Sequence, residues 1–523
     1  MKSAECSIYI DDFMPVEDVG GIPYSRHEIH RIIVCTSGEG EVEIVLQPGF
    51  NFGRAGCSIR SEKFGCVASG GREQMSLSAP VKLRVSGGKA TGLIRVKKGE
   101  VIPVVLRWNE GKTQRAKMEY SGVMLKDTIA YWRKWAAKTK YDGLWKEQVK
   151  RSALVLKLLT YSPSGAICAA ATTSLPESIG HDRNWDYRFS WIRDSTYALI
   201  SFNALGHTEE EKKYFLWLLH LLRGNLSRPD MLRVMYTVEG DTVPRERTVG
   251  RLSGYRDSRP VREGNSATDQ LQLDIYGSVV DAVYMTFRPP EKLPDMMWRI
   301  VDSIADYVVS NWKRKDMGIW EMRNGVDRHT HSALLSWVAL SRTSEMAAWQ
   351  GYRGREKRYA RVAEEVRKTV LEGAYSSSLH SYSSSIGGGY LDASVLLMPL
   401  LGIVDARDPR FLSTLDAVRK HLLKSGFIYR YRGKDGLAGR EGAFLICTFW
   451  FIAAMAKAGM AEEAKALFEH VLGHSNHLGL FSEEIDPASG EFLGNFPQAF
   501  SHMGLIDAAR ILSEELGAKK GEN

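Results

Sequence analysis

The spacing of apolar residues changes once along the chain. Between Ser7 and about residue 110, short apolar or alternating runs at 32–34, 42–45, 81–85 and 101–106 are separated by glycine-rich turns. Such runs are typical of β-strands. From about Thr128 to the C-terminus, apolar residues recur at positions i, i+3 and i+4, which is the helical period. The pattern predicts a mainly α protein with an N-terminal β domain.

About a dozen helix-length segments follow one another in the second part of the chain. They cover residues 147–161, 191–205, 210–222, 268–286, 294–312, 332–343, 356–371, 393–401, 411–424, 443–457, 461–472 and 500–516. Helices in sequential pairs suit a closed α/α barrel, although the period alone fits a solenoid equally well. Because no fixed sequence repeat is visible, we favour the barrel.

Composition narrows the class of protein. A chain of 523 residues with 44% hydrophobic content can bury a large core. The net charge of +8 is spread through mixed-sign segments, and the absence of a long Lys/Arg run argues against nucleic-acid binding. We find neither an N-terminal apolar targeting segment nor an apolar run of the roughly 18 to 20 residues that span a membrane. We therefore expect a soluble, cytoplasmic protein without a nucleic-acid or membrane partner.

Two acidic motifs, about 160 residues apart, are candidates for catalysis. Glu321 lies in the predicted loop at 318–323, beside Trp320, where partial desolvation would suit a general acid. The pair Glu483 and Glu484 precedes a long, glycine-rich turn. Cleavage of a glycosidic bond with inversion needs two such carboxyl groups, one to protonate the leaving oxygen and one to activate water. Each motif alone also fits ordinary surface glutamates.

A third cluster, at 180–195, combines tryptophans with charged side chains. Bidentate hydrogen-bonding groups and aromatic faces are what a sugar site requires, and Trp185, Trp191, Arg193 and Asp194 offer both. A structural ion-pair network at a helix start is the competing interpretation. A fourth polar stretch, at 259–277, either lines a pocket or caps a helix.

Other chemistry finds little support in the sequence. The six cysteines form no CxxC pair, and His329 and His331 lack a third ligand at a diagnostic spacing, so we predict no metal site. Ser195 and Ser482 do not lie in the Gly-x-Ser-x-Gly turn of a serine hydrolase.

Taken together, the segments 183–194, 318–323, 482–487 and 494–502 resemble glycoside hydrolase family 15. This family contains glucoamylases, glucodextranases and the prokaryotic trehalases. The segments 259–277 and 441–450 also match its pattern, so the resemblance covers roughly residues 150 to 515. It implies an (α/α)6 barrel that is preceded by a β-sandwich and removes the non-reducing glucose of an α-glucoside with inversion. We accordingly expect the β-sandwich at 1–110, a linker and helical connection at 111–140, and the barrel at 141–523.

The resemblance also implies roles for single residues. Glu321 matches the general acid and Glu483 the general base, whereas Glu484 is expected to be structural. Arg193 and Asp194 match residues that hold the glucose hydroxyls. The full set of expected substrate-binding residues is Trp185, Trp191, Arg193, Asp194, Tyr236, Trp320, Arg323 and Glu441. The chemistry requires no cofactor and no metal; the expected partner is a small saccharide, and the question of a homo-oligomer stays open.

The choice of substrate is less sharply indicated. The form of the segment 184–194 resembles the trehalase branch of the family more than the usual prokaryotic glucoamylases. We therefore put α,α-trehalase first and glucoamylase second. A catalytically silent sugar-binding or regulatory protein, similar to the phosphorylase kinase regulatory subunits, is a remote third.

Two segments depart from the family pattern. Residues 9–15 resemble a segment that usually lies well inside the β-sandwich, so we expect a truncated sandwich whose open edge is covered by a partner, a tag or another subunit. The loop at 242–250 also differs from the usual family sequence, which leaves the outer part of the binding site unassigned.

Overall fold

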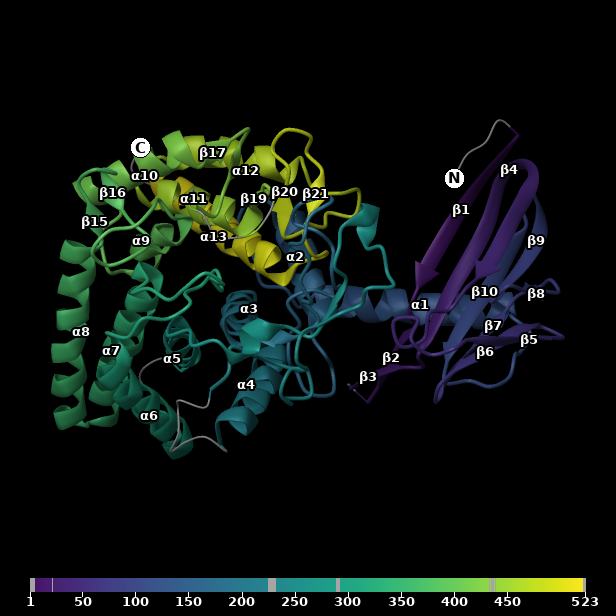
Figure 1. Cartoon of the computed structure of the whole chain (residues 1–523), viewed down its shortest axis with the longest axis horizontal. Coiled ribbons are helices and arrows are strands. Elements are labelled where there is room, and N and C mark those ends of the chain that lie inside the picture. The colour runs from purple at the N-terminus through teal and green to yellow at the C-terminus, as the bar shows by residue number, and fades with distance from the viewer. Residues whose placement is uncertain are drawn as a thin grey trace. The chain divides into compact units, whose positions relative to one another are not determined.

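The computed structural model describes residues 5–20, 22–223, 232–287, 292–431, 433, 437 and 439–520. The chain forms two compact units, Met1–Ala137 and Lys138–Asn523. The first, purple to blue in Figure 1, is built mainly of β-strands, and the second is helical. The predicted fold class is therefore confirmed. Among the described residues, no helix combines the length and the apolar character that crossing a membrane requires.

The first unit is an antiparallel β structure with one helix. Its elements are β1 (Cys6–Phe13), β2 (Val16–Val19), β3 (Ile22–Ser25), β4 (Glu28–Leu46), β5 (Ser58–Glu62), β6 (Gly65–Gly70), β7 (Glu73–Ser78), β8 (Arg84–Ser86), β9 (Lys89–Lys97), β10 (Val101–Trp108) and α1 (Met118–Ala136). The strand order is β5-β6-β7-β10-β4-β9-β8, with β1 also paired to β4. Buried Ile33, Leu77, Leu83 and Val104 form its core, and α1 packs against β2 and β10.

Strand β4 is longer than the sequence predicts. The two runs at 32–34 and 42–45 belong to one strand of 19 residues, which pairs with β1 and β10 in its first half and with β9 in its second. Gly38 does not turn the chain. Its φ is +71°, and a Cβ atom there would lie 1.8 Å from the carbonyl oxygen of Glu5. The glycine thus lets β4 exchange one partner strand for another without a break.

Twelve helices, α2 to α13, make up the described part of the second unit as two rings. The inner ring is α3 (Ile192–Ala204), α5 (Asp274–Thr286), α7 (Thr330–Gln350), α9 (Leu397–Leu401), α11 (Leu445–Lys457) and α13 (Ala499–Lys520). The outer ring is α2 (Lys146–Leu159), α4 (Thr208–Arg223), α6 (Asp295–Asn311), α8 (Arg353–Gly373), α10 (Pro409–His421) and α12 (Ala461–Leu472).

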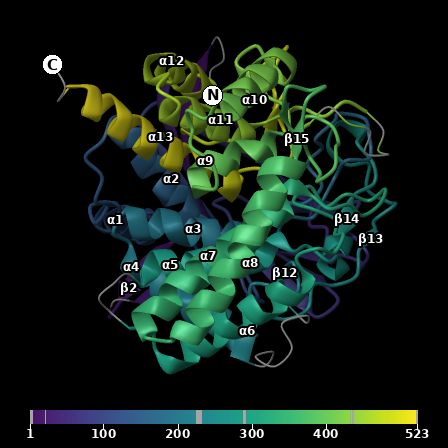
Figure 2. The same cartoon turned by 90° about the vertical axis from the view of Figure 1, so that its left-hand side faces the viewer.

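Contacts close the inner ring. Helix α3 packs on α5, α5 on α7, α11 on α9 and α13, and α13 returns to α3. The 3₁₀ turn η4 (Ala393–Leu396), which precedes α9, links α7 to α11. Each outer helix lies against an inner neighbour, as α8 lies along α7 in Figure 2. This closed double ring is an (α/α)6 barrel and not an open solenoid.

Burial explains which helices are inside. In α11, every residue from Leu445 to Ala456 is buried, and a helix that is apolar all round must be covered on every side. Outer helix α8 instead buries a single stripe that includes Tyr359, Val362, Val366 and Val370. Inner and outer helices therefore differ in how much of their surface is buried.

Short paired strands lie in the loops between the helices. They are β11 (Ser190–Trp191) with β12 (Met235–Tyr236), β13 (Arg247–Thr248) with β14 (Arg262–Glu263), β15 (Tyr375–Ser376) with β16 (Ser381–Tyr382), β17 (Leu423–Lys424) with β18 (Phe427–Ile428), and β19 (Ala443–Phe444) with β20 (Glu484–Ile485) and β21 (Phe492–Leu493). Strand β11 runs into α3, and β19 runs into α11. The N-terminal ends of the inner helices thus carry the polar motifs.

Several helix boundaries differ from the sequence prediction. Helix α1 begins at Met118 and not near Thr128, and α7 continues to Gln350. Helix α5 begins at Asp274, because residues Ser266–Asp269 form a separate 3₁₀ turn, η3, capped by the side chain of Asn265. Apolar spacing does not distinguish such a turn from the first turn of an α-helix. Another 3₁₀ turn, η2, covers Tyr255–Asp257.

We predict that Gly277→Ala destabilises the barrel strongly. A Cβ atom at Gly277 in α5 would lie 2.1 Å from the carbonyl oxygen of Leu335 in α7, so two inner helices would have to separate. Overpacking costs about 1–3 kcal/mol or more. Gly354→Ala in α8 is the matched control, since a Cβ atom there has no neighbour within 4 Å. Denaturant unfolding should show a loss for the first variant and no loss for the second; equal stabilities would contradict this packing.

Candidate active site

One cavity in the helical unit collects most of the predicted site residues. It encloses about 820 Å³, part of which is open to solvent. Its charged lining consists of Glu177, Arg183, Arg193, Asp194, Glu321, Arg323, Arg430 and Glu483. Its aromatic lining consists of Trp185, Tyr187, Trp191, Trp320, Tyr431, Phe444 and Phe500. Of the ten residues predicted for the site, only Tyr236 and Glu441 are absent from this lining.

Glu321 enters the cavity from a strained turn between α6 and α7. Its φ is +58°, a left-handed conformation that is uncommon for a residue with a side chain. The side-chain amide of Gln270 donates to its carbonyl oxygen at 3.2 Å. The indole Nε1 of Trp191 donates to carboxyl Oε1 at 2.7 Å, and Nη2 of Arg193 lies 3.6 Å from the same oxygen. Among the described residues none donates to Oε2, so this oxygen is available to a ligand.

Glu483 is fully buried and held by different partners. The hydroxyl of Tyr187 donates to Oε1 at 2.6 Å, and the backbone N–H of Asn495 donates to Oε2 at 3.4 Å. Gly494 has a φ of +72°, and a Cβ atom there would lie 2.4 Å from Oε2, so only glycine lets the chain pass this carboxyl group. Burial, and then the charge of Glu177, raises the pKa of Glu483 well above its ordinary value.

Two aromatic side chains connect the carboxyl groups. Tyr187, which donates to Glu483, packs edge-on against Trp191 with ring centroids 5.2 Å apart. Trp191 in turn donates to Glu321. Because both aromatic residues belong to the segment that leads into α3, the start of this one helix sets the position of both carboxyl groups.

Arg193 and Asp194 lie in the first turn of α3. The guanidinium group of Arg193 donates to Gln272 and to Asp274, each at 2.8 Å, and to the carbonyl oxygen of Ile319 at 3.2 Å. Asp194 accepts no hydrogen bond from the described residues, and its nearest cation is Nε of Arg193 at 3.8 Å. Burial, opposed by Arg193, raises the pKa of Asp194 to about 7. A buried carboxyl group that faces a cavity without a donor is suited to accept from a ligand.

Arg430 is the cation among several buried carboxyl groups. Carboxyl oxygens of Glu177, Glu441 and Glu484 lie within 4.8 Å of one another, a grouping that could by itself hold a metal ion. Nη2 of Arg430 lies 3.2 Å from Glu177 and 3.5 Å from Glu484, and it also donates to Glu441. Arg183 donates to Glu441 at 2.8 Å. Glu441 therefore anchors both arginines from behind the cavity wall.

Two of the three predicted tryptophans, Trp320 and Trp185, differ in their surroundings. Trp320 donates from Nε1 to Asp392 at 2.9 Å and packs edge-on against Phe444, with 5.7 Å between the ring centroids. The ring of Trp185 is covered by guanidinium groups, because the central carbons of Arg323 and Arg262 lie 4.0 and 4.3 Å from its centroid. Trp185 thus supports arginines at the cavity wall.

Tyr236 lies away from the cavity. Its hydroxyl accepts from the backbone N–H of Arg233 at 3.0 Å, and its ring packs edge-on against Trp217, with centroids 6.3 Å apart. These contacts join β12 to the residue Arg233 that precedes it and to helix α4.

Several cavity residues have no sequence signal of their own. Glu177 and Arg430 do not belong to any of the motifs singled out from the sequence, yet they lie in the lining beside Glu483. Tyr187 lies inside the motif at 183–194, but nothing in its spacing indicates a bond to a residue 296 positions away. Gln272 and Asp274 lie in the polar stretch at 259–277 and accept from Arg193, whereas Asn265 of the same stretch lines the cavity.

Known proteins similar to this chain define its class. The family model described as "Glycosyl hydrolases family 15" matches residues 143–510. A trehalase from Thermoplasma volcanium is 35% identical over 517 residues, which cover 99% of this chain and 82% of that protein. A trehalase from Mycolicibacterium smegmatis is 37% identical, over 92% of this chain and 74% of that protein. These matches place the chain in one class of enzymes, the glycoside hydrolases.

A solved structure supports the same fold. The crystal structure of a bacterial glucoamylase in complex with acarbose superposes with a TM-score of 0.74 at 15% identity, over 97% of this chain and 82% of that one. The chain belongs to glycosyl hydrolase family 15.

Proposed function

We propose that the chain is an inverting α,α-trehalase in which Glu321 is the general acid and Glu483 the general base. The observation that carries this proposal is the pair of carboxyl groups in one cavity, in contrasting environments, linked through Trp191 and Tyr187. Inverting hydrolases require two carboxyl groups with separate roles.

One glucose unit would bind beside Asp194 and Arg193. The hydroxyl groups of the sugar supply the donors that Asp194 lacks, and the arginine donates to hydroxyl oxygens. The apolar face of the ring would contact the aromatic wall, which includes Trp191, Trp320 and Phe444. Polar edges and apolar faces of the sugar are then both satisfied.

Protonation of the leaving oxygen would come from Oε2 of Glu321. Since Oε1 already accepts from Trp191, the proton resides on the other oxygen, which has no donor among the described residues. The left-handed backbone at Glu321 fixes this orientation. Proton donation and departure of the second sugar then occur together.

Water activation would fall to Glu483. The carboxylate removes a proton from water that attacks the anomeric carbon on the face away from the leaving group. The bond from Tyr187 and the backbone N–H of Asn495 leave the carboxylate only one orientation. Its raised pKa makes it a stronger base once it is ionised.

We put trehalose first as the substrate because several proteins similar to this chain are named trehalase. Proteins named trehalase, 33–37% identical, match this chain over most of its length. The glucoamylase structure, at 15% identity, supports the fold alone. The cytoplasmic location, the domain boundaries at 110 and 140 and a homo-oligomer stay predictions.

Glucose release from trehalose, maltose, isomaltose and soluble starch, with the anomers followed by proton NMR in the first minutes, tests this function. An inverting trehalase gives equal α- and β-glucose from trehalose and no product from the other three. Release of β-glucose from maltose and starch would make the chain a glucoamylase, and no release from any of them would leave a silent binder.

We predict that Glu321→Gln and Glu483→Gln each lower kcat by roughly a thousandfold or more, because each removes one proton transfer. Initial rates at saturating trehalose measure the loss. Glu491→Gln, on the exposed part of the turn after Glu483, serves as the control and should change kcat by less than about twofold. Turnover near that of the parent protein in either of the first two variants would remove that residue from catalysis.

Tyr187→Phe should move the acidic limb of kcat/KM to higher pH. The base acts when ionised, so activity is lost as the pH falls through the pKa of Glu483, which is already raised. The hydroxyl of Tyr187 stabilises the ionised form and lowers this pKa; its removal raises the pKa further. A bond to a charged group contributes about 1.5–3 kcal/mol, which corresponds to about one pH unit or more. An unmoved limb would contradict the role of Glu483 as the base.

A further inference from the structure

Arg323 lies in the outer part of the cavity wall. This is the most exposed of the charged side chains that line the described cavity, at 32%, compared with 21% for Glu321 and 0% for Glu483. It follows Glu321 by two residues. The acid and this arginine therefore share one loop, with the arginine nearer to solvent.

Two contacts hold Arg323 in place. Its guanidinium carbon lies 4.0 Å from the centroid of the Trp185 ring, and its Nη2 donates to Oε2 of Glu246 at 3.1 Å. An arginine that is stacked on an indole and bonded to a carboxylate has little rotational freedom left. Arg323 is thus a fixed part of the wall.

Glu246 is braced from several sides. Its Oε1 accepts from Nε of Arg262 at 3.1 Å, and its Oε2 accepts from the N–H and the hydroxyl of Ser266, each at 3.2 Å. Arg262 also donates to the carbonyl oxygens of Asp182 and Asn184, at 2.8 and 3.0 Å. Although burial alone would raise the pKa of Glu246, the bond and charge of Arg323 lower it, so the carboxyl group is ionised at neutral pH.

This brace lies in the segment whose sequence departs from the family pattern. Glu246 directly precedes β13, which pairs with β14 at Arg262, so the segment is anchored to the stretch that leads into α5. The bond from Arg323 to Glu246 joins the acid-bearing loop to the segment at 242–250, which lies about 75 residues earlier in the chain. Both arginines that cover Trp185 bond to this one carboxylate.

We propose that Glu246 is a positioning residue that holds Arg323 across the outer end of the cavity and thereby limits the substrate to two sugar units. The inference rests on the proposed function and names the residues that set substrate length. The fixed guanidinium donates to hydroxyls of the second glucose. A third sugar would have to displace Arg323 from Trp185 and leave the Glu246 carboxylate without one of its cations.

The test compares substrates that differ only beyond the first glucose: α-glucosyl fluoride, trehalose, maltose and maltotriose. We expect Glu246→Gln to raise KM for trehalose about tenfold and to change kcat little, because ground-state binding of the second sugar is weakened. Hydrolysis of α-glucosyl fluoride, which has no second sugar, should change less than about twofold. The ratio of kcat/KM for maltotriose to that for trehalose, measured at enzyme concentrations high enough to detect maltotriose cleavage in the parent, should rise at least about tenfold.

Two further variants separate positioning from a general loss of structure. Glu239→Gln removes an exposed carboxylate from the same region of the chain and should leave all four rates unchanged. Arg323→Ala should give the same shift in substrate ratio as Glu246→Gln. The double variant should be no worse than Arg323→Ala alone, because Glu246 acts through Arg323.

The outcomes distinguish this inference from the proposed function. Equal losses on trehalose and α-glucosyl fluoride in Glu246→Gln, or an unchanged substrate ratio, would overturn the role of Glu246. A parent protein that cleaves maltose but not trehalose would overturn the trehalase assignment alone, and the maltotriose-to-maltose ratio would then test Glu246. Additive effects in the double variant would show that Glu246 does not act through Arg323.

Discussion

Burial of carboxyl groups beside a few fixed arginines is the constraint on which the site depends. Glu177, Glu483 and Glu484 are almost inaccessible to solvent, and an isolated ionised carboxylate in such a position would be strongly destabilising. Arg430 lies among these acids, and Arg193 lies beside Asp194 at the start of α3 and Asp274 at the start of α5. Burial raises the pKa values of Glu177 and Glu483, and the charge of Arg430 offsets only part of this rise.

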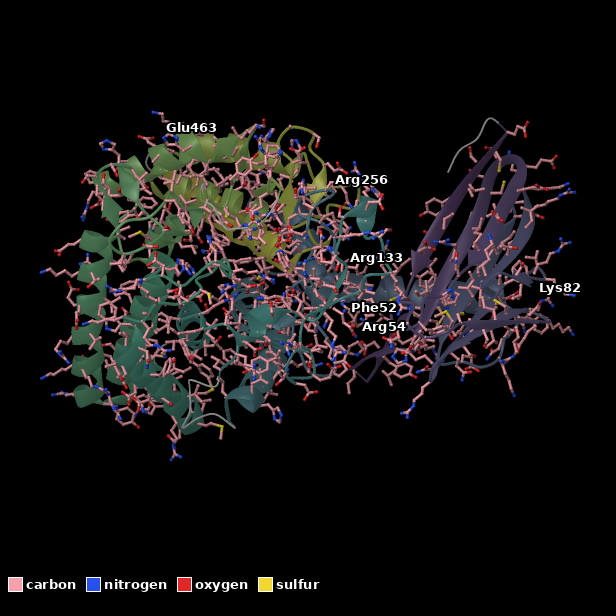
Figure 3. The ribbon with its side chains drawn as sticks, in the orientation of Figure 1. Phe52, Arg54, Lys82, Arg133, Arg256 and Glu463 are labelled. Carbon is pink, nitrogen blue, oxygen red and sulfur yellow. The ribbon has the colours of Figure 1, made fainter. Side chains whose placement is uncertain are left out.

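The barrel provides the rigid frame that this charge distribution needs. The site residues lie in turns and short strands before the inner helices, and the inner helices are packed closely enough that Gly277 admits no side chain. Many charged side chains outside this region are exposed, as Lys82 and Glu463 are in Figure 3. Surface charge of this kind accounts for the positive balance of the chain.

A left-handed residue lies at or beside each of the two proposed catalytic groups. Glu321 adopts a left-handed conformation that costs about 1–3 kcal/mol, and Gly494 provides the space beside Glu483. The bonds from Gln270, Trp191 and Asn495 hold both carboxyl groups in these positions. In the same way, Glu246 and Trp185 hold Arg323 at the outer wall. The side chains of Glu321, Glu483 and Arg323 are thus each oriented by neighbours from other segments of the chain.

The sequence by itself determined the classes of element and most of the chemistry. Its apolar period indicates strands and then helices, because burial of one face or of a whole helix determines which nearby positions are apolar. The motifs around Glu321, Glu483 and Asp194 carry the family resemblance. Only the tertiary structure decided that β4 is one strand, that Tyr236 lies outside the cavity, that Trp185 supports arginines, and that Tyr187, Arg430 and Glu246 reach the site. The physical reason is distance along the chain: these contacts join residues that closure of the barrel brings together, and side-chain spacing records only neighbours within a few turns of helix.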